Sequence, residues 1–247
     1  MRILIALFSA MVSFNHYGQS ITDLSLDYAF TPLNFIRLKS ETNDFDSLSA
    51  ARNELENKGF AFNSSLKAGI KVNPKLFLET GIGMLILTSQ SNAINRSSRH
   101  FMYGDDIIAG EYVFRYILLD VPLMARYELL KRNYTLFALS GFTFSNSIER
   151  SVVSDLTSVS GEELRTSEKI QFNAKENKLL FSGKLGLQME FDVKKVLFRK
   201  NSNLVMYYQI IYRHMFSSLW TDSISERYHG VDFGCGVRYR LNKNGYK

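Results

Sequence analysis

The sequence predicts an all-β protein, an eight-stranded antiparallel up-and-down transmembrane β-barrel. Three observations support this fold class: apolar and polar residues alternate with period two, the alternating segments are long, and short and long connections take turns along the chain. Successive side chains of a strand point to opposite faces, so this alternation indicates strands with one apolar and one polar face. About 9–11 tilted residues cross a bilayer as a strand, and the clearest segments reach that length.

The composition agrees with a folded domain. The chain has 247 residues, of which 45% are hydrophobic and 13% aromatic, so it can bury a large core and is not disordered as a whole. Its single cysteine, Cys235, excludes an intramolecular disulfide framework. The net charge of +6 raises the question of nucleic-acid binding, which the distribution of the charges must answer.

The first residues predict export. Arg2 is followed by the apolar run 3–14 and a small residue, Gly18, a pattern typical of a signal peptide over residues 1–18. The run is shorter than the roughly 20 residues of a membrane-spanning helix. A buried N-terminal strand or helix is the alternative. We therefore expect residues 19–247 to form the barrel domain outside the cytoplasm, with no nucleic-acid partner.

Eight segments carry the alternation. In residues 179–193, for example, Leu185, Leu187 and Phe191 lie on one face, and Lys184 and Glu190 on the other. The predicted strands are residues 21–30, 60–72, 76–87, 114–129, 134–148, 179–193, 204–216 and 228–241. The phase is least clear in residues 134–148, where large apolar residues fall on both faces.

The connections give a second signal. Residues 72–75, 130–133 and 194–203 are short, whereas 31–59, 88–113, 149–178 and, to a lesser extent, 217–227 are long. In a closed meander, every short connection then lies at one end and every long one at the other. Short periplasmic turns and long extracellular loops are typical of outer-membrane barrels. The sequence therefore predicts a protein of the cell outer membrane.

The polar row of the strands is expected to face the lumen. An eight-stranded barrel has an interior just wide enough for side chains to fill. The row contains charges of both signs and many glycines, so we expect a filled polar lumen of hydrogen bonds and ion pairs, not a wide pore. Its charged members are Lys67, Glu79, Asp120, Arg126, Lys184, Glu190, Asp232 and Arg238.

Two segments resemble a known family. Residues 119–127, with the sequence LDVPLMARY, and 136–141, with the sequence LFALSG, resemble strands of the PorT-like outer membrane protein beta-barrel domain of Bacteroidota. Gln19, after the predicted cleavage site, is also typical of that phylum. The resemblance implies an eight-stranded outer-membrane barrel and carries no shared catalytic residue. The chain departs from such barrels at its polar C-terminal tail, 242–247.

The sequence predicts no catalytic, cofactor-binding or metal-binding residues and no cofactor. His100, His214 and His229 lack the spacing of metal ligands. One enzymatic alternative is open: some eight-stranded outer-membrane barrels are lipid A deacylases, and His214, Ser217 and Glu226 could supply the histidine, serine and acid of such a hydrolase. The deacylase pattern places serine two residues after histidine, where this chain has Phe216.

The leading functional hypothesis is a structural or interaction role through the long extracellular loops. Its partners would be outer-membrane lipid and an envelope protein. The alternatives are the lipid-modifying enzyme and a soluble calyx-like lipid carrier, which would need an apolar interior. The basic charge belongs to the short-turn end, which carries +9 when Glu128 and Asp192 are included, so the basicity predicts contact with anionic headgroups. Its cations are Lys71, Lys75, Lys131, Arg132, Lys194, Lys195, Arg199, Lys200, Arg240, Lys243 and Lys247.

Overall fold

A computed structural model describes residues 21–38, 58–90, 107–158, 161, 163–169, 179–192, 203–219 and 225–241. The predicted signal peptide, residues 1–18, lies outside the described residues, as do most of the long connections. No helix in the described ranges is long and apolar enough to cross a bilayer. The strands are β1 (Ile21–Leu38), β2 (Lys58–Lys71), β3 (Leu76–Gln90), β4 (Ile107–Lys131), β5 (Thr135–Ser158), β6 (Glu163–Lys169), β7 (Leu179–Asp192), β8 (Leu204–Met215) and β9 (Ser225–Arg240).

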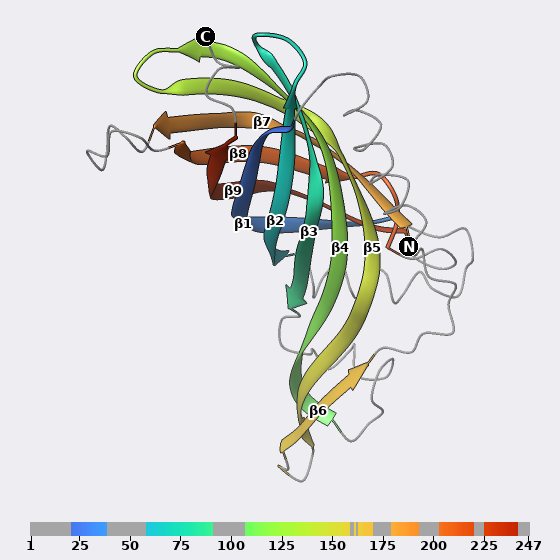
Figure 1. The fold of residues 1–247 in the computed structure, drawn as a ribbon. Helices are drawn as coiled ribbons and strands as arrows, with labels where there is room; N and C mark the ends of the chain where they lie inside the picture. The colour runs from blue at the N-terminus through green and yellow to red at the C-terminus, as the bar shows by residue number, and fades with distance from the viewer. Residues whose placement is uncertain are drawn as a thin grey trace.

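Eight of these strands close into a barrel. They pair antiparallel in the order β1-β2-β3-β4-β5-β7-β8-β9, and β9 pairs back onto β1, whereas β6 joins only the far part of β5 (Figure 1). Each strand of the ring lies beside the one that precedes it in the ring and the one that follows. The predicted eight-stranded up-and-down barrel is therefore confirmed, and β6 is an additional strand that the sequence did not predict.

The strands are inclined to the barrel axis. A walk around the ring along paired residues starts at Leu24 of β1 and returns to β1 at Asn34, ten residues further on. This stagger is the shear of the barrel, and a closed barrel with shear has tilted strands. The walk passes through Ala68, Thr80, Leu123, Phe142, Gly183, His214 and His229.

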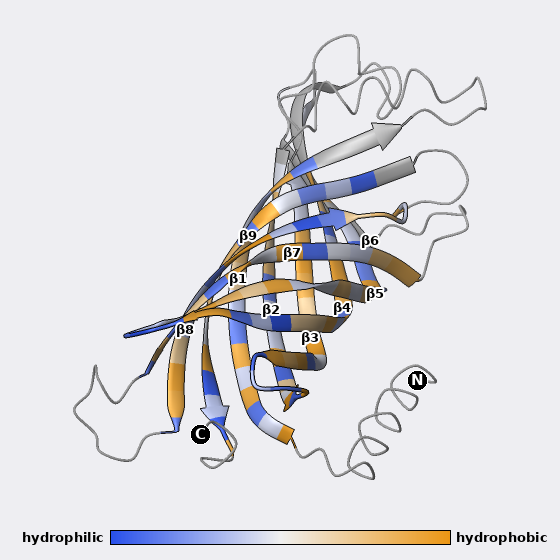
Figure 2. Ribbon diagram, turned by 90° about the horizontal axis from the view of Figure 1, so that it is seen from above, coloured by the Kyte–Doolittle hydropathy of each residue, from blue (hydrophilic) through white to orange (hydrophobic). Residues whose placement is uncertain are grey.

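The two faces of the strands differ as predicted. Leu185 is 64% exposed on the outer face of β7, whereas Gln188 of the same strand is 2% exposed inside. The structure also resolves the unclear phase of residues 134–148, since Leu139 faces the lumen and Phe142 the outside. Figure 2 shows the resulting alternation of apolar and polar residues along the ribbons.

Beyond the barrel wall, β4 and β5 continue together. β3 pairs with β4 only as far as Val113, and β7 pairs with β5 only as far as Asn146. The remainder, residues 107–112 and 147–158, forms with β6 a three-stranded sheet, named here the extension, that projects past the ring (Figure 1). The prediction that residues 88–113 and 149–178 are simple long loops is thus wrong for these strand residues.

The opposite end carries the short turns. The β2–β3 turn spans residues 72–75, and the amide oxygen of Asn73 accepts hydrogen bonds from the backbone amides of Lys75 (2.9 Å) and Leu76 (2.8 Å), a local bond that favours this turn. The β4–β5 turn spans residues 132–134. We call this the short-turn end and the end with the extension the long-loop end.

Candidate functional site: a filled lumen and an outward-facing rim

The lumen near the short-turn end is filled by arginines and carboxylates from five strands. Arg238 of β9 contacts Asp23 of β1 (3.2 Å), Glu79 of β3 (2.7 Å) and Glu190 of β7. Arg126 of β4 contacts the same three carboxylates, at 3.4 Å from Asp23 and 3.0 Å from Glu79. Arg240 adds a 3.0 Å contact to Glu190. Because Arg238 and Arg126 each meet three acids, the network ties opposite walls of the barrel together.

Aromatic rings support the two central arginines. The guanidinium carbon of Arg126 lies 4.7 Å from the ring centre of Phe77 and 4.6 Å from that of Phe137. That of Arg238 lies 5.0 Å from the ring centre of Tyr207. A cation over a ring face is attracted by the ring's negative face, more strongly where water is excluded. These side chains are almost fully buried, so the rings hold the arginines in place as well as filling space.

The next layer is a single ion pair with two hydroxyl partners. The Lys67 ammonium lies 2.7 Å from a carboxylate oxygen of Asp27. The hydroxyls of Tyr207 (2.6 Å) and Ser65 (2.8 Å) donate hydrogen bonds to the two oxygens of the same carboxylate. A buried carboxylate is tolerated when it is paired and hydrogen-bonded, and Asp27 meets both conditions.

A third polar layer lies about halfway along the strands. Arg213 of β8 contacts Asp120 (3.4 Å) and Asp232 (3.3 Å), and the Thr31 hydroxyl donates a 2.6 Å hydrogen bond to Asp232. Next to it, Lys184 lines a cavity of about 20 Å³ between this layer and the Asp27 layer. A cavity of this size has room for about one water molecule.

These three layers balance in charge. Six cationic and six acidic side chains meet in these three layers, so their formal charges cancel. The cations are Lys67, Arg126, Lys184, Arg213, Arg238 and Arg240, and the acids are Asp23, Asp27, Glu79, Asp120, Glu190 and Asp232.

Towards the long-loop end the lumen becomes apolar. A buried cluster fills it, consisting of Leu33, Ala61, Leu85, Leu87, Phe114, Tyr116, Leu118, Leu180, Met215, Leu219 and Tyr228. Arg150 covers this cluster, since its side chain donates to the carbonyl of Leu219 (3.0 Å) and lies over the ring of Tyr116. The prediction of a filled polar lumen is therefore right for the part nearer the short turns and wrong for the end below the long loops.

Two residues of the enzymatic alternative, His214 and Ser217, each contact other groups in the described part of the chain. His214 lies on the outer face of β8, where its ring contacts Phe216 and His229. The Ser217 hydroxyl instead accepts a 2.6 Å hydrogen bond from the backbone amide of Phe181 and lies 3.4 Å from the carbonyl of the same residue. The side chain of Glu226 lies outside the described residues. The described geometry thus gives Ser217 a role in joining the chain after β8 to β7.

Outward-facing rings form a band near the long-loop end. Phe181 contacts Phe142, Phe144 and Phe216 at 5.1–5.6 Å between ring centres. On β8 and β9, the rings of Tyr212, His214 and His229 continue the band. Sequence reasoning treated each histidine alone and did not pair them. The antiparallel register, which places His214 opposite His229, supplies that information.

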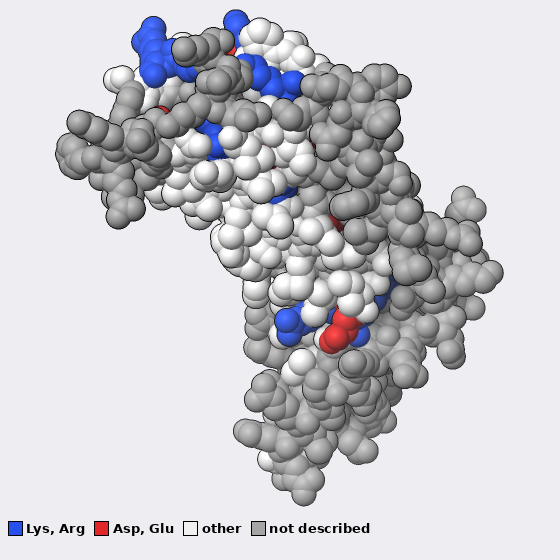
Figure 3. Space-filling model, viewed as in Figure 1, with Lys and Arg blue, Asp and Glu red and all other residues white. Residues whose placement is uncertain are grey.

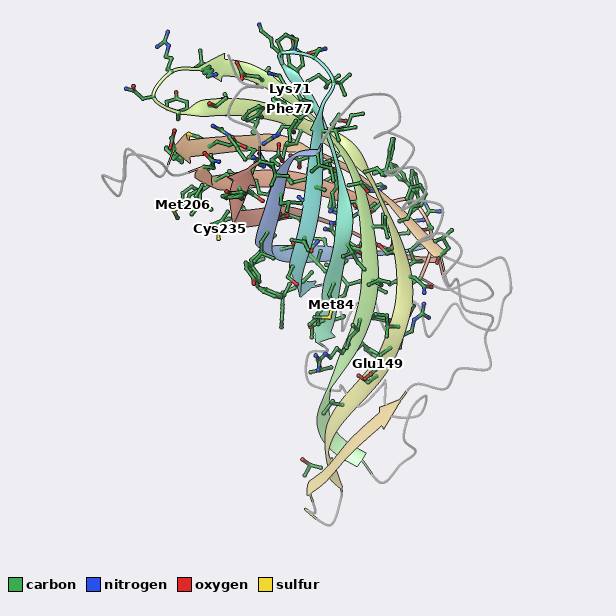
Figure 4. The ribbon with its side chains drawn as sticks, viewed as in Figure 1. Lys71, Phe77, Met84, Glu149, Met206 and Cys235 are labelled. Carbon is green, nitrogen blue, oxygen red and sulfur yellow. The ribbon has the colours of Figure 1, made fainter. Side chains whose placement is uncertain are left out.

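The described residues contain no group of three or more histidine, cysteine, aspartate or glutamate side chains arranged to hold a metal ion. The free Cys235 is exposed on the outer face, where Figure 4 shows it on the same side of the barrel as Met206, and Met84 projects from β3.

No protein-family model and no curated protein matches the chain. Several solved structures resemble the chain. The chain resembles Ail, the attachment invasion locus protein of Yersinia pestis, at 12% identity and a TM-score of 0.36, over 89% of this chain and 100% of that one. It also resembles Neisserial surface protein A at 9% identity and a TM-score of 0.39, over 89% of this chain and 97% of the other.

A third similar structure is the outer membrane protease OmpT of Escherichia coli, at 10% identity and a TM-score of 0.44, over 90% of this chain and 98% of that one. At these identities the likeness concerns the fold alone.

Proposed function

We propose that the protein is an outer-membrane β-barrel that serves a structural or interaction role through its long-loop end. The observation that carries this proposal is the inversion of a soluble fold: the outer face of the ring is apolar and the lumen holds the charges. An outward charge at mid-membrane depth costs about 2–4 kcal/mol. This cost accounts for the placement of the charged strand residues on the lumen side and not on the lipid side.

The outer face supports contact with lipid. Large apolar side chains on all eight ring strands are more than a third exposed, for example Leu66, Leu123, Leu187 and Ile210. Soluble monomers rarely expose contiguous apolar patches larger than a few hundred Å². On the face that Figure 3 shows, the middle of the barrel is largely uncharged; Lys and Arg gather at the short-turn end, and a smaller group of charges lies toward the extension.

The charges support an orientation. Lys71, Lys75, Lys131 and Arg132 lie in or next to the two described short turns. Cationic residues at a membrane surface are attracted by anionic phospholipid headgroups. We place the short-turn end in the periplasm and the extension at the cell surface.

The lumen argues against transport or carriage of a ligand. Ion pairs cross it from wall to wall, and its described polar cavity has a volume of about 20 Å³, far below the roughly 300 Å³ or more of small-molecule sites. A calyx-like lipid carrier needs an apolar chamber. In this barrel the charged layers fill that part of the interior. Interaction therefore falls to the outer end, where β6 is the last strand of the extension and pairs with β5.

The proposed partners are outer-membrane lipid, around the belt, and an envelope protein, at the long-loop end. An edge strand such as β6 can accept a further strand from a partner. Membership of the PorT-like family of Bacteroidota stays a prediction, as does the cleavable signal peptide.

Cell fractionation and site-specific labelling test this proposal. In a Cys235→Ser background, Thr157→Cys of the extension should react with a membrane-impermeant maleimide on intact cells. The matched variant Lys75→Cys, in the β2–β3 turn, should react only after the outer membrane is opened. The protein should also be found in the outer-membrane fraction and migrate differently on gels before and after heating. Recovery in a soluble fraction without detergent would overturn the proposal, and reversed labelling would overturn the orientation.

A further inference from the structure

Three nitrogen-bearing side chains lie on the outer face of β8 and β9 at the long-loop end. They are Arg227 and His229 of β9 and His214 of β8, named here the rim cluster. In β9 the residues Tyr228 and Gly230 are buried, so by alternation Arg227 and His229 point outward. The rings of His214 and His229, which are register partners, lie 6.3 Å apart with 37° between their planes.

The rim cluster lies where the apolar belt ends. The aromatic rings of Tyr212 and Phe216 contact His214 from either side along β8. Next to β9, the outward positions of β1 change from Phe30 to the exposed Asn34, which is the register partner of His229. Amphipathic and aromatic side chains favour the headgroup level of a membrane. The cluster is therefore at the height of lipid headgroups, not of acyl chains.

Two atoms of the cluster lack partners within the described part of the chain. The Nε of Arg227 and the Nδ1 of His229 are shielded from solvent and have no hydrogen-bond partner there. Both residues are partly exposed as a whole, so the cluster is open to a ligand from outside the barrel. A guanidinium offers a planar set of donors that matches a phosphate group, and two imidazoles beside it can add donors when protonated.

We infer that the rim cluster binds the phosphate monoester of a lipid headgroup in the outer leaflet, with Arg227 as the main contact and the two histidines as secondary donors. This inference rests on the proposed outer-membrane location. The described residues around the cluster contribute no acid that would repel a phosphate: β8 presents Tyr212, β1 presents Pro32 and Asn34, and β7 presents Gly183 opposite His214.

Native mass spectrometry or calorimetry on the intact barrel in detergent micelles tests the inference. The probes are bisphosphorylated lipid A, the same lipid with its phosphates removed, and inorganic phosphate. Bisphosphorylated lipid A should bind at least about tenfold more tightly than the dephosphorylated lipid, because charge-assisted hydrogen bonds to phosphate are lost with the group. Arg227→Ala should reduce the preference about tenfold, whereas the matched variant Arg115→Ala, an exposed cation on β4, should leave it unchanged.

A histidine variant separates the histidines from the arginine. The double variant His214→Gln/His229→Gln should lose a smaller part of the wild-type preference than Arg227→Ala and keep the Arg227-dependent part.

Three results would overturn the inference. These are equal binding of the two lipids, an equal effect of Arg115→Ala and Arg227→Ala, or competition by millimolar inorganic phosphate that identifies a soluble anion as the ligand. Loss of binding with EDTA would assign the histidines to a metal instead and would overturn it as well. Outer-membrane fractionation of each variant is scored separately, so a failure of lipid binding in a correctly inserted barrel leaves the proposed function standing.

Discussion

The isolated Asp27–Lys67 pair allows a sharp test of how the filled lumen holds the barrel together. Replacement of Lys67 by Met keeps the length and most of the volume of the side chain but removes the ammonium that lies 2.7 Å from Asp27. Removing one partner of a buried ion pair costs about 3–5 kcal/mol, because the other charge stays buried without compensation. Tyr207 and Ser65 still donate to Asp27, so we expect the lower end, about 3 kcal/mol.

Reversible urea unfolding in detergent micelles or small vesicles measures this cost. With a slope of about 2 kcal/mol per molar urea, the midpoint of Lys67→Met should fall by about 1.5 M at an unchanged slope. The double variant Asp27→Asn/Lys67→Met removes both charges and keeps one acceptor oxygen at position 27. Only one of the two hydroxyls can donate to the single amide oxygen of this asparagine, and the other can accept from its NH2 group. The double variant should recover at least half of the loss, since neutral replacement of both members of a buried pair is often close to neutral in stability.

Two outcomes of these urea melts would refute this account of the Asp27–Lys67 pair. If Lys67→Met unfolds within about 0.5 kcal/mol of the wild type, the ammonium is solvated and the lumen is not the closed interior described above. If the double variant is no more stable than the single one, the loss comes from packing of the lysine stem and not from the unpaired carboxylate. Urea melts of the outward variant Leu66→Met, on the neighbouring position of β2, control for the introduction of methionine.

Three further predictions follow from the wall and the lumen. Leu185→Arg, at the middle of the outer face, should destabilise insertion into vesicles by about 2–4 kcal/mol, whereas Leu129→Arg near the short turns should cost about 0–1 kcal/mol. Gly141→Ala should lower the free energy of unfolding by about 1–3 kcal/mol, because its added Cβ would lie 2.1 Å from the carbonyl oxygen of Leu123. Leu118→Ala, in the apolar cluster, should cost about 2–5 kcal/mol, yet planar-bilayer recordings should show no open-pore conductance, since the charged layers still close the lumen.

The fold could be predicted from the sequence because the membrane strongly constrains which side chains of each strand face lipid and which face the lumen. A slip of one residue would turn Lys67, Glu79 or Arg126 towards lipid, which costs up to about 2–4 kcal/mol for a cation at mid-membrane depth and less for an acid or near the interface. The charged row therefore marks the lumen even where the apolar pattern is noisy. The loop lengths then fix which end of each strand is which, without any information on tertiary contacts.

The same reasoning fails where both faces of a strand have similar surroundings. At residues 84–87 of β3, Met84 and Ile86 face outward while Leu85 and Leu87 enter the buried cluster. A continuous apolar run has no period, so the apolar end of the lumen could not be separated from the lipid face. In the extension the pattern is mixed and polar, as in residues 149–155, so β6 and the far parts of β4 and β5 gave no apolar face to detect.

The candidate site was missed for a different reason. His214 was weighed with Ser217 because the two are close in sequence, but the neighbour that matters, His229, is brought in by strand pairing. The sequence pattern does not indicate a role for Arg227, because a single arginine at a strand end is common in proteins. Only the register, together with the height of the aromatic band, shows that the three side chains share one outward surface.

The division of the lumen into charged layers and an apolar end has a consequence for function. The charged layers link β1, β2, β3, β4, β7, β8 and β9 through ion pairs that tolerate little rearrangement. The apolar cluster is packed and closed by Arg150. Packed interiors resist small changes in volume. Sequence change that alters binding is therefore easiest beyond the ends of β3 and β7, in the extension and the loops. The extension lies outside the ring, so partner specificity can vary there while the wall and the lumen stay the same.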